Sequence, residues 1–434
     1  MDAPRLSPPI PSLWSHTAVP AQAFPPLGRD LQADVAIIGG GYTGLSAAHH
    51  IAASGLRPAV LDANSIGWGA SGRNGGVVSA KFRLPFAQIA ATHSMDVARR
   101  MYAIAHESVD VLEELVGTLK LDQAQYARVG QIKGAHNAAS LAATLADMAW
   151  MRSEMGDACV SALSKTEVAE ETGSTSFVGG VLSPHAGAIH PLNYVRGLAA
   201  SVASRGIDIF EGSPALRIHR GADAVTVETP NGNLRAKQVI LATNGYSDLT
   251  SAASSVRNNL IPFRSAIIAT APLNETQSAA VMPTRRTYVE TRRMMRWFRV
   301  VDNRVIFGGR GAFGKTDSEA AFRTLRRAMV RTFPILADAS IAFRWSGLVG
   351  MTLDALPHIG RLDDRVLFAM GYNGAGVAMS TLMGKYLAAF VRREAPDVAL
   401  LEASRFRPVP LYAFREAGVR LVAAWYQFLD SMGQ

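Results

Sequence analysis

Apolar and polar residues follow one another along this chain in patterns that predict two kinds of layered structure. Residues 35–38 (VAII) and 58–61 (PAVL) are short apolar runs, as found in parallel strands that are buried on both faces. Between them, residues 43–54 are mostly small or apolar and end before Gly55, which predicts a helix. Together these segments predict a β–α–β unit near the N-terminus.

Further helices and strands are expected beyond this unit. In residues 93–118 and 137–155, apolar residues recur every three to four positions with charged residues between them, which predicts helices. Residues 239–244 (VILATN) form another buried strand pattern. Residues 207–212 and 224–229 read as a strand and as one arm of a hairpin.

A second group of segments predicts an antiparallel sheet. Residues 261–273, 287–301 and 304–311 alternate or are rich in β-formers, and Asn303 marks a turn between the last two. Residues 317–333 predict a helix. The last segment with helical spacing, 415–432, is amphipathic, and we expect it to pack against the body of the protein rather than contact a membrane.

Composition narrows the class of protein. A chain of 434 residues is too long for one ordinary core and predicts two connected domains. The lone cysteine, Cys159, excludes an internal disulfide framework and a cysteine-rich metal site, so we expect no metal and a cytoplasmic location. The start of the chain lacks the pattern of a signal peptide, and no stretch of about 20 apolar residues predicts a membrane span.

The formal net charge is +9, which favours anionic ligands. Arginines gather in residues 285–299, but they alternate with apolar residues as in a strand and form no continuous basic run. Nucleic-acid binding is therefore the weaker interpretation of the charge.

The most informative motif lies at the turn of the β–α–β unit. Gly39, Gly41 and Gly44 satisfy the pattern G-x-G-x-x-G: the first permits a tight turn, the second lets a pyrophosphate approach, and the third lets helix and strand pack closely. The N–H groups at the helix N-terminus attract phosphate. Asp62 ends the second strand, where a carboxylate can bind a ribose diol. The order of these parts predicts a dinucleotide site.

The second strand leads into a glycine-rich stretch, residues 66–76 (IGWGASGRNGG). Dense glycine costs backbone entropy and suits backbone that approaches a ligand closely. We expect a second ligand-contacting loop here, in which Ser71 caps a short helix directed at the same pyrophosphate.

These motifs resemble those of the D-amino-acid oxidase-like FAD oxidoreductases, most closely the γ-glutamylputrescine oxidase branch. The resemblance rests on GGGYTGLSAA (39–48), GASGRNGG (69–76) and later segments, which include VILATNGYS (239–247), MTLDALPHIGR (351–361) and MGYNGAGVAMS (370–380). It implies an α/β fold in which a discontinuous Rossmann-like FAD-binding domain is joined to an α+β domain whose antiparallel sheet covers the flavin. The implied cofactor is FAD rather than NAD.

The resemblance also implies a division of the chain. We expect a lead-in segment at 1–33, an FAD-binding domain made of 34–92, 156–255 and 340–405, a cap domain made of 93–155 and 256–339, and a C-terminal amphipathic helix at 406–434.

The cofactor contacts implied by the family motifs involve the turn, the glycine-rich loop and the start of a late helix. The residues expected to bind FAD are Gly39, Gly41, Tyr42, Thr43, Gly44, Asp62, Ala63, Gly69, Ala70, Ser71, Arg73, Asn74, Gly75, Gly76, Ala215, Thr243, Asn244, Gly245, Gly347, Asn373, Gly374, Ala375, Gly376 and Val377. Ala375 stands where the family usually has a histidine. Neither a cysteine at 349–351 nor a histidine in 66–76 is present for covalent attachment, so we expect non-covalent FAD.

The implied reaction oxidises the carbon beside a nitrogen in an amine or amino acid to an imine, by hydride transfer to the flavin, with reoxidation by dioxygen or another acceptor. No catalytic side chain is required by this chemistry. His190 is a candidate pocket residue, whereas His358 is expected in the core. A strand at 292–299 is expected to line the pocket with one of its two faces, which carry either Met294, Arg296 and Phe298 or Met295, Trp297 and Arg299. An arginine on that face, Arg296 or Arg299, would bind a substrate carboxylate.

Two alternatives stay open from the sequence. One is a dehydrogenase that passes electrons to a quinone or carrier, and the other is a flavin-bearing protein that modifies RNA or binds nucleic acid. A small-molecule amine and an electron acceptor are the expected partners.

Overall fold

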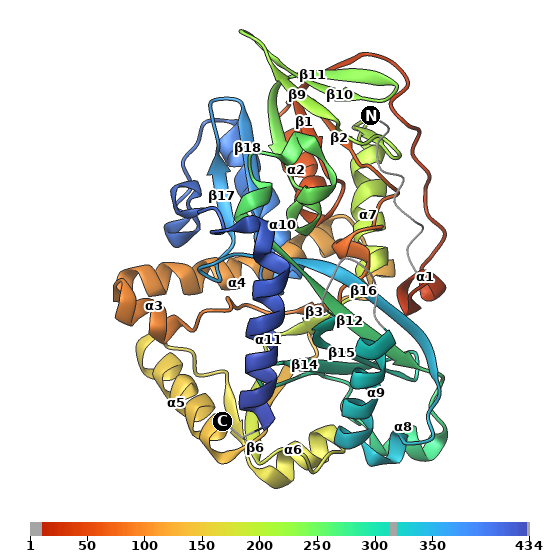
Figure 1. The fold of residues 1–434 in the computed structure, drawn as a ribbon, viewed down its shortest axis with the longest axis vertical. Coiled ribbons are helices and arrows are strands. Elements are labelled where there is room, and N and C mark those ends of the chain that lie inside the picture. The colour runs from red at the N-terminus through yellow and green to blue at the C-terminus, as the bar shows by residue number, and fades with distance from the viewer. Residues whose placement is uncertain (1–10, 313–318, 432–434) are drawn as a thin grey trace.

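The computed structural model describes residues 11–312 and 319–431, which fold around two large sheets (Figure 1). In the first sheet, the buried runs recognised in the sequence pair in parallel, with strand order β17-β18-β11-β1-β2-β8. β17 pairs antiparallel at one edge, and β9 and β10 form a hairpin extension on β11. The strands are β1 (Leu31–Ile38), β2 (Pro58–Leu61), β8 (Asp208–Phe210), β9 (Arg217–Arg220), β10 (Val225–Thr229), β11 (Gly232–Leu241), β17 (His358–Arg361) and β18 (Val366–Met370).

Helices cover this first sheet and share one hydrophobic core with it. The fully buried side chains Ile37 of β1, Leu45 of α2 and Leu382 of α10 belong to the same cluster. Small residues on α2 suit this close packing, since Gly384 of α10 lies against Ser46 and Ala47 of α2. The helices are α2 (Tyr42–Ala53), α3 (Phe86–Thr92), α4 (Met95–Thr118), α7 (Pro191–Ser204) and α10 (Gly376–Val391).

The second sheet is mainly antiparallel, with strand order β16-β12-β15-β14-β13-β4-β6-β5. Its outer face packs on α9, where Phe298, Phe307 and Phe333 form a buried aromatic cluster. The elements are β4 (Gln131–Ala135), β5 (Ser161–Leu163), β6 (Gly179–Ser183), β12 (Ile261–Thr270), β13 (Thr287–Glu290), β14 (Arg296–Val301), β15 (Arg304–Ala312), β16 (Ile341–Met351), α5 (Ala138–Glu154), α6 (Lys165–Thr172), α8 (Glu275–Ala280) and α9 (Glu319–Thr332). The two kinds of sheet expected from the sequence are therefore present.

Three of the expected domain boundaries are wrong. Strands β5, β6 and β16 were placed in the FAD-binding domain, but they belong to the second sheet. Helix α4 was placed in the cap, but its residues Met101, Ile104 and Leu112 are buried in the core beside α10. Sequence spacing predicted the helix at 93–118, but it did not predict β5, β6 or β16 as strands, and it carries no information about which sheet or core an element joins.

The expected strand at 287–301 is two strands. β13 ends at Glu290, β14 begins at Arg296, and the two pair antiparallel, with Tyr288 opposite Phe298. Residues 291–295 form the connection. The connection reads TRRMM and contains no Gly, Pro, Asn or Asp, so no turn residue marked it in the sequence.

Both ends of the chain depart from expectation. The Pro-rich lead-in contains a short helix, α1 (Leu13–Thr17), whose Leu13 and Trp14 are fully buried. At the other end, α11 (Arg415–Ser431) forms as expected and crosses the front of the molecule from the upper to the lower half (Figure 1).

The expectation that the apolar side of α11 packs against the body is wrong for most of that helix. Leu421, Trp425 and Phe428 are each more than half exposed, whereas Ala423 is buried. Their spacing of four and three residues places the three exposed side chains on one face, away from Ala423. Within the described residues no helix is long and apolar enough to cross a bilayer.

Candidate functional site

A cavity of about 1170 Å³ opens at the carboxyl ends of β1 and β2, where the G-x-G-x-x-G turn leads into α2. Gly39 has φ +110°, a conformation that favours glycine, and Gly41 is the N-cap of α2. A Cβ on Gly44 would lie 1.9 Å from the carbonyl oxygen of Gly39, so only glycine fits there. The bare turn brings the helix N-terminus to the cavity wall.

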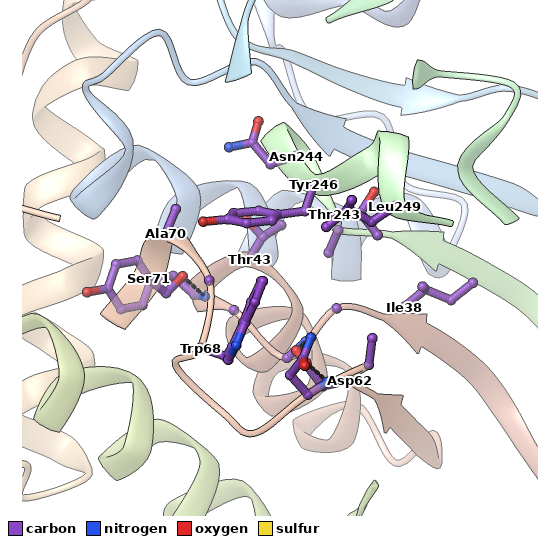
Figure 2. A pocket seen from close by; sticks show the side chains of 18 of the residues that line it. Ile38, Thr43, Asp62, Trp68, Ala70, Ser71, Thr243, Asn244, Tyr246 and Leu249 are labelled. Carbon is purple, nitrogen blue, oxygen red and sulfur yellow. Dashed lines mark hydrogen bonds between the residues drawn. The ribbon is translucent and has the colours of Figure 1, made fainter. Parts of the chain in front are cut away.

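Asp62 lies at the floor of the cavity, directly after β2 (Figure 2). Its Oδ2 accepts a hydrogen bond from Gly40 N at 2.8 Å, and its Oδ1 accepts one from Asn64 N at 2.9 Å. Burial raises the pKa of the carboxyl to about 6. At neutral pH the group is an anion with oxygen lone pairs available to the hydroxyl groups of a ligand.

The glycine-rich loop forms a second wall. Trp68 of this loop and Tyr246 both line the cavity and contact each other, with ring centroids 5.6 Å apart in an edge contact (Figure 2). Ser71 does not cap a helix of its own, because Gly69 is the N-cap of the short 3-10 helix Ala70–Gly72. Instead its hydroxyl accepts a hydrogen bond from Tyr42 N at the start of α2, so the loop is tied to the phosphate-binding turn.

The cap sheet and α10 close the remaining sides. Leu348 and Val349 of β16 reach the cavity, as do Gly376 and Val377 at the N-terminus of α10. Thr43 Oγ1 and the Tyr372 hydroxyl are 2.6 Å apart, which joins the starts of α2 and α10. Two helix N-termini therefore meet one enclosed space.

The structure brings together most residues that the sequence indicated for the cofactor. Those lining the cavity are Gly39, Gly41, Tyr42, Thr43, Asp62, Ala63, Gly69, Ala70, Ser71, Asn74, Ala215, Thr243, Asn244, Gly374, Gly376 and Val377. Segments more than 300 residues apart in sequence therefore meet at one site.

Eight expected residues are not among those that line this cavity: Gly44, Arg73, Gly75, Gly76, Gly245, Gly347, Asn373 and Ala375. Arg73 extends to β16, where its Nε donates to the carbonyl of Ser346 at 2.6 Å. Asn373 is buried, and its Oδ1 accepts from Thr352 N at 3.0 Å. The motif glycines among them allow close packing of the layers that support the wall.

Sequence reasoning missed several lining residues. Those that lie inside segments already recognised could have been included: Gly40, Gly67, Trp68, Ala242, Tyr246, Tyr372 and Ser380. The others are on no recognised motif or at strand ends: Ile38, Leu61, Asn64, Gly212, Pro214, Pro230, Asn231, Leu249, Thr250, Leu348 and Val349.

The expected pocket strand does not present Phe298 or Arg296 to the cavity. Phe298 is 1% exposed and stacks between Tyr288 and Phe307 on the outer face of the sheet. Arg296 is two residues before Phe298 on β14 and lies on the same face of the sheet. Its Nε lies 3.5 Å from a carboxylate oxygen of the buried Glu290. Both assignments to the substrate pocket are therefore wrong, since side chains two apart on a strand share one face.

Arg299 lies on the face toward the FAD-binding domain, but it is only 5% exposed and does not line the cavity. Its Nη2 donates to the carbonyl of Ile189 at 2.8 Å, and its guanidinium carbon lies 5.2 Å from the centre of the Trp14 ring. Burial lowers its pKa to about 10, so it stays protonated at neutral pH. In this position the Arg299 side chain is bound to the main chain and to Trp14, and its expected role in binding a substrate carboxylate stays a prediction.

His190 is also a structural residue rather than part of this pocket. It is the N-cap of α7, where its Nδ1 accepts from Asn193 N at 3.2 Å, and its Nε2 lies 3.0 Å from the hydroxyl of Thr17. Burial lowers its pKa to about 4, so the ring is neutral. His358 is 1% exposed and bonds Asp354 and Glu402, which matches the core position expected for it.

The donor set of the cavity fits a dinucleotide. The volume of the cavity exceeds the space that most small ligands require. Its walls combine helix N-termini, which can bind phosphates, with a carboxylate that can bind a ribose. No group of three or more metal-binding side chains occurs within the described ranges. The chemistry offered is binding of a large anionic nucleotide.

Comparison with known proteins agrees with this geometry: residues 34–390 match the family model described as FAD dependent oxidoreductase. The chain belongs to this family. It is 30% identical to gamma-glutamylputrescine oxidoreductase from Escherichia coli (strain K12), over 97% of this chain and 98% of that protein. It is also 30% identical to a probable oxidoreductase, OrdL, from Haemophilus influenzae, over 94% of both chains.

Solved structures confirm the fold. Glycine oxidase from Geobacillus kaustophilus superposes with a TM-score of 0.73 at 20% identity, over 87% of this chain and 99% of that one. Family membership confirms FAD as the cofactor and an oxidoreductase as the class of enzyme. The individual FAD contacts expected from the sequence stay predictions, supported by their place around the cavity.

Proposed function

We propose that the protein oxidises a C–N bond of an amine or amino acid to an imine, with γ-glutamylated polyamines as the first substrates to test. The observation that carries the proposal is a cavity shared by the dinucleotide turn and the cap strand β16. The chain's likeness to gamma-glutamylputrescine oxidoreductase over nearly its whole length supports this choice of substrate class.

In this reaction the substrate loses a hydride from carbon and a proton from nitrogen, and water then hydrolyses the imine to a carbonyl compound and an amine or ammonia. Bound FAD supplies the ring that accepts the hydride. The protein's part is to bind the nucleotide, orient the amine and exclude bulk water. Gly41 and the start of α2 would hold the pyrophosphate, Asp62 would hold the adenosine ribose, and Leu348 and Val349 would cover the ring end.

The test is flavin reduction without oxygen. Purified protein is mixed anaerobically with a γ-glutamylated polyamine, a secondary N-methyl amino acid and a D-amino acid, and the loss of oxidised flavin absorbance is followed. Rapid bleaching by one of these amines is expected. If none of them, and no other primary or secondary amine, reduces the flavin, the proposed reaction is wrong.

Readmitting air to the reduced enzyme separates an oxidase from a dehydrogenase. Fast return of the oxidised spectrum with formation of hydrogen peroxide identifies dioxygen as a competent acceptor. Slow return, combined with fast oxidation by a soluble quinone, identifies a dehydrogenase.

A further inference from the structure

Two buried tryptophans hold consecutive peptide carbonyls of the glycine-rich loop. Trp14 of α1 donates from its indole Nε1 to the carbonyl of Asn74 at 2.8 Å. Trp345 of β16 donates from its Nε1 to the carbonyl of Arg73 at 3.0 Å. Both side chains are fully buried, and their rings meet edge to face at 6.4 Å. One tryptophan comes from the lead-in and the other from the cap.

Fixing these carbonyls also fixes the N–H groups that follow them. In a planar trans peptide the carbonyl and the next N–H point in opposite directions. Trp345 therefore sets the direction of the Asn74 N–H, and Trp14 sets that of the Gly75 N–H. Within the described chain neither N–H donates a hydrogen bond, and Asn74 lines the cavity.

The Asn74 side chain makes the loop rigid from within. Its Nδ2 donates to the carbonyls of Ala70 and Ser71, each at 3.1 Å, and its Oδ1 accepts from Gly76 N at 2.7 Å. These hydrogen bonds fix the shape of the loop, so its orientation depends on contacts with the rest of the protein. The two indoles provide such contacts, by hydrogen bonds to adjacent residues of the loop.

Trp14 is itself held on two sides. The His190 ring meets it at 4.9 Å, and the buried Arg299 guanidinium lies over its face. Arg299 also lies close under Gly76, because a Cβ at Gly76 would come within 2.6 Å of the arginine Nη2. Two of the four residues that the sequence suggested for the substrate pocket, His190 and Arg299, thus position the tryptophan.

We propose that Trp14 and Trp345 are positioning residues that hold the peptide groups on either side of Asn74, so that the Asn74 N–H is directed toward bound FAD. The proposal rests on FAD occupying the cavity as described under the proposed function. It gives the lead-in a role in cofactor binding, although Trp14 precedes the residues that match the family.

The experiment measures FAD affinity in Trp14→Phe and Trp345→Phe. Phenylalanine keeps an aromatic ring in the core but removes the indole donor, so the carbonyl loses its partner. The matched control is Trp150→Phe on α5, a partly buried tryptophan that contacts the core away from the loop. Holoenzyme is diluted, and the fluorescence of released flavin gives the dissociation constant. Thermal unfolding is recorded with and without saturating FAD.

We expect FAD binding to weaken by about tenfold in each loop variant, a change of about 1.4 kcal/mol, and to stay within about twofold in Trp150→Phe. The stabilisation of the fold by FAD should shrink accordingly. The double variant should lose less than the sum of the two, because both donors grip one rigid loop.

Two outcomes would overturn the inference. One is unchanged FAD affinity in both loop variants, and the other is an equal loss of thermal stability with and without FAD, which would indicate a role in the fold alone. If one variant fails to fold, the other decides. Absence of FAD binding in the wild-type protein would instead refute the proposed function.

Discussion

Asp62 provides the most direct test of the cofactor site, through the substitution Asp62→Asn. The carboxylate is anchored by Gly40 N and Asn64 N at 2.8 and 2.9 Å, which leaves its other lone pairs directed at the cavity. Hydrogen bonds to a charged acceptor contribute about 1.5–3 kcal/mol, and each 1.4 kcal/mol is tenfold in affinity. We therefore expect FAD to bind about 10- to 100-fold more weakly to the variant.

The raised pKa of Asp62 adds a pH dependence with a definite sign. Because the folded-state pKa of about 6 lies above the ordinary value of 3.8, protonation of this group stabilises the apo fold; this contribution is full below about pH 3.8 and is lost as pH rises through 6. The charged form is expected to bind FAD more tightly than the neutral form, so wild-type affinity should fall as pH drops below about 6. The difference between wild type and Asp62→Asn should shrink over the same interval.

Fluorescence titration of the deflavinated protein from pH 5 to 8 measures both effects. Asp34→Asn is the matched control, since Asp34 lies on β1 away from the cavity and pairs with Lys237 at 3.0 Å. That variant should keep wild-type FAD affinity at every pH. Equal dissociation constants for wild type and Asp62→Asn at pH 8 would show that the ribose is bound elsewhere.

Other changes test the site and its supports separately. Gly41→Val should abolish FAD binding without unfolding the protein, because its side chain would enter the cavity beside Ser71; full flavin occupancy in a folded variant would contradict this. Acid precipitation should release all the FAD, and flavin that remains with the pellet would reveal covalent attachment. Phe298→Ala should lower the free energy of unfolding by about 3–5 kcal/mol, as measured by urea denaturation, while a loss within 1 kcal/mol would be inconsistent with its buried stack. Arg296→Met should leave the Michaelis constant unchanged, whereas a large increase would return this residue to the pocket.

The sequence predicts the dinucleotide turn well because its chemistry is local. Gly39 has a positive φ, and Gly41 lies where the backbone approaches the cavity. A Cβ at Gly44 would lie 1.9 Å from the carbonyl oxygen of Gly39. All three requirements arise within one turn and one helix. Asp62 follows from the fixed length of a β–α–β unit. Such features depend on spacing alone, so they can be read without knowing the rest of the fold.

The pocket side chains could not be predicted in the same way, because strand alternation gives two faces but not their surroundings. The pattern correctly separated Arg296 and Phe298 from Trp297 and Arg299. Only the packing of α9 on one side of the sheet and of the glycine-rich loop on the other decides which pair faces α9 and which faces the loop. Trp14 was hidden for a different reason, since one turn of helix in a Pro-rich segment has too few residues to show a period.

The cavity also explains why the loop keeps its backbone so bare. Among the described residues that line it there is no lysine or arginine, and Asp62 adds a negative charge. The excess of nine positive charges in the chain therefore does not neutralise a bound pyrophosphate through direct side-chain contacts. We therefore expect peptide N–H groups at the start of α2, at the start of α10 and in the glycine-rich loop to do so instead. Glycine at these positions lets the backbone come close to the phosphates. Hydrogen bonds from Trp14 and Trp345, together with those of the Asn74 side chain, hold the loop backbone in its orientation.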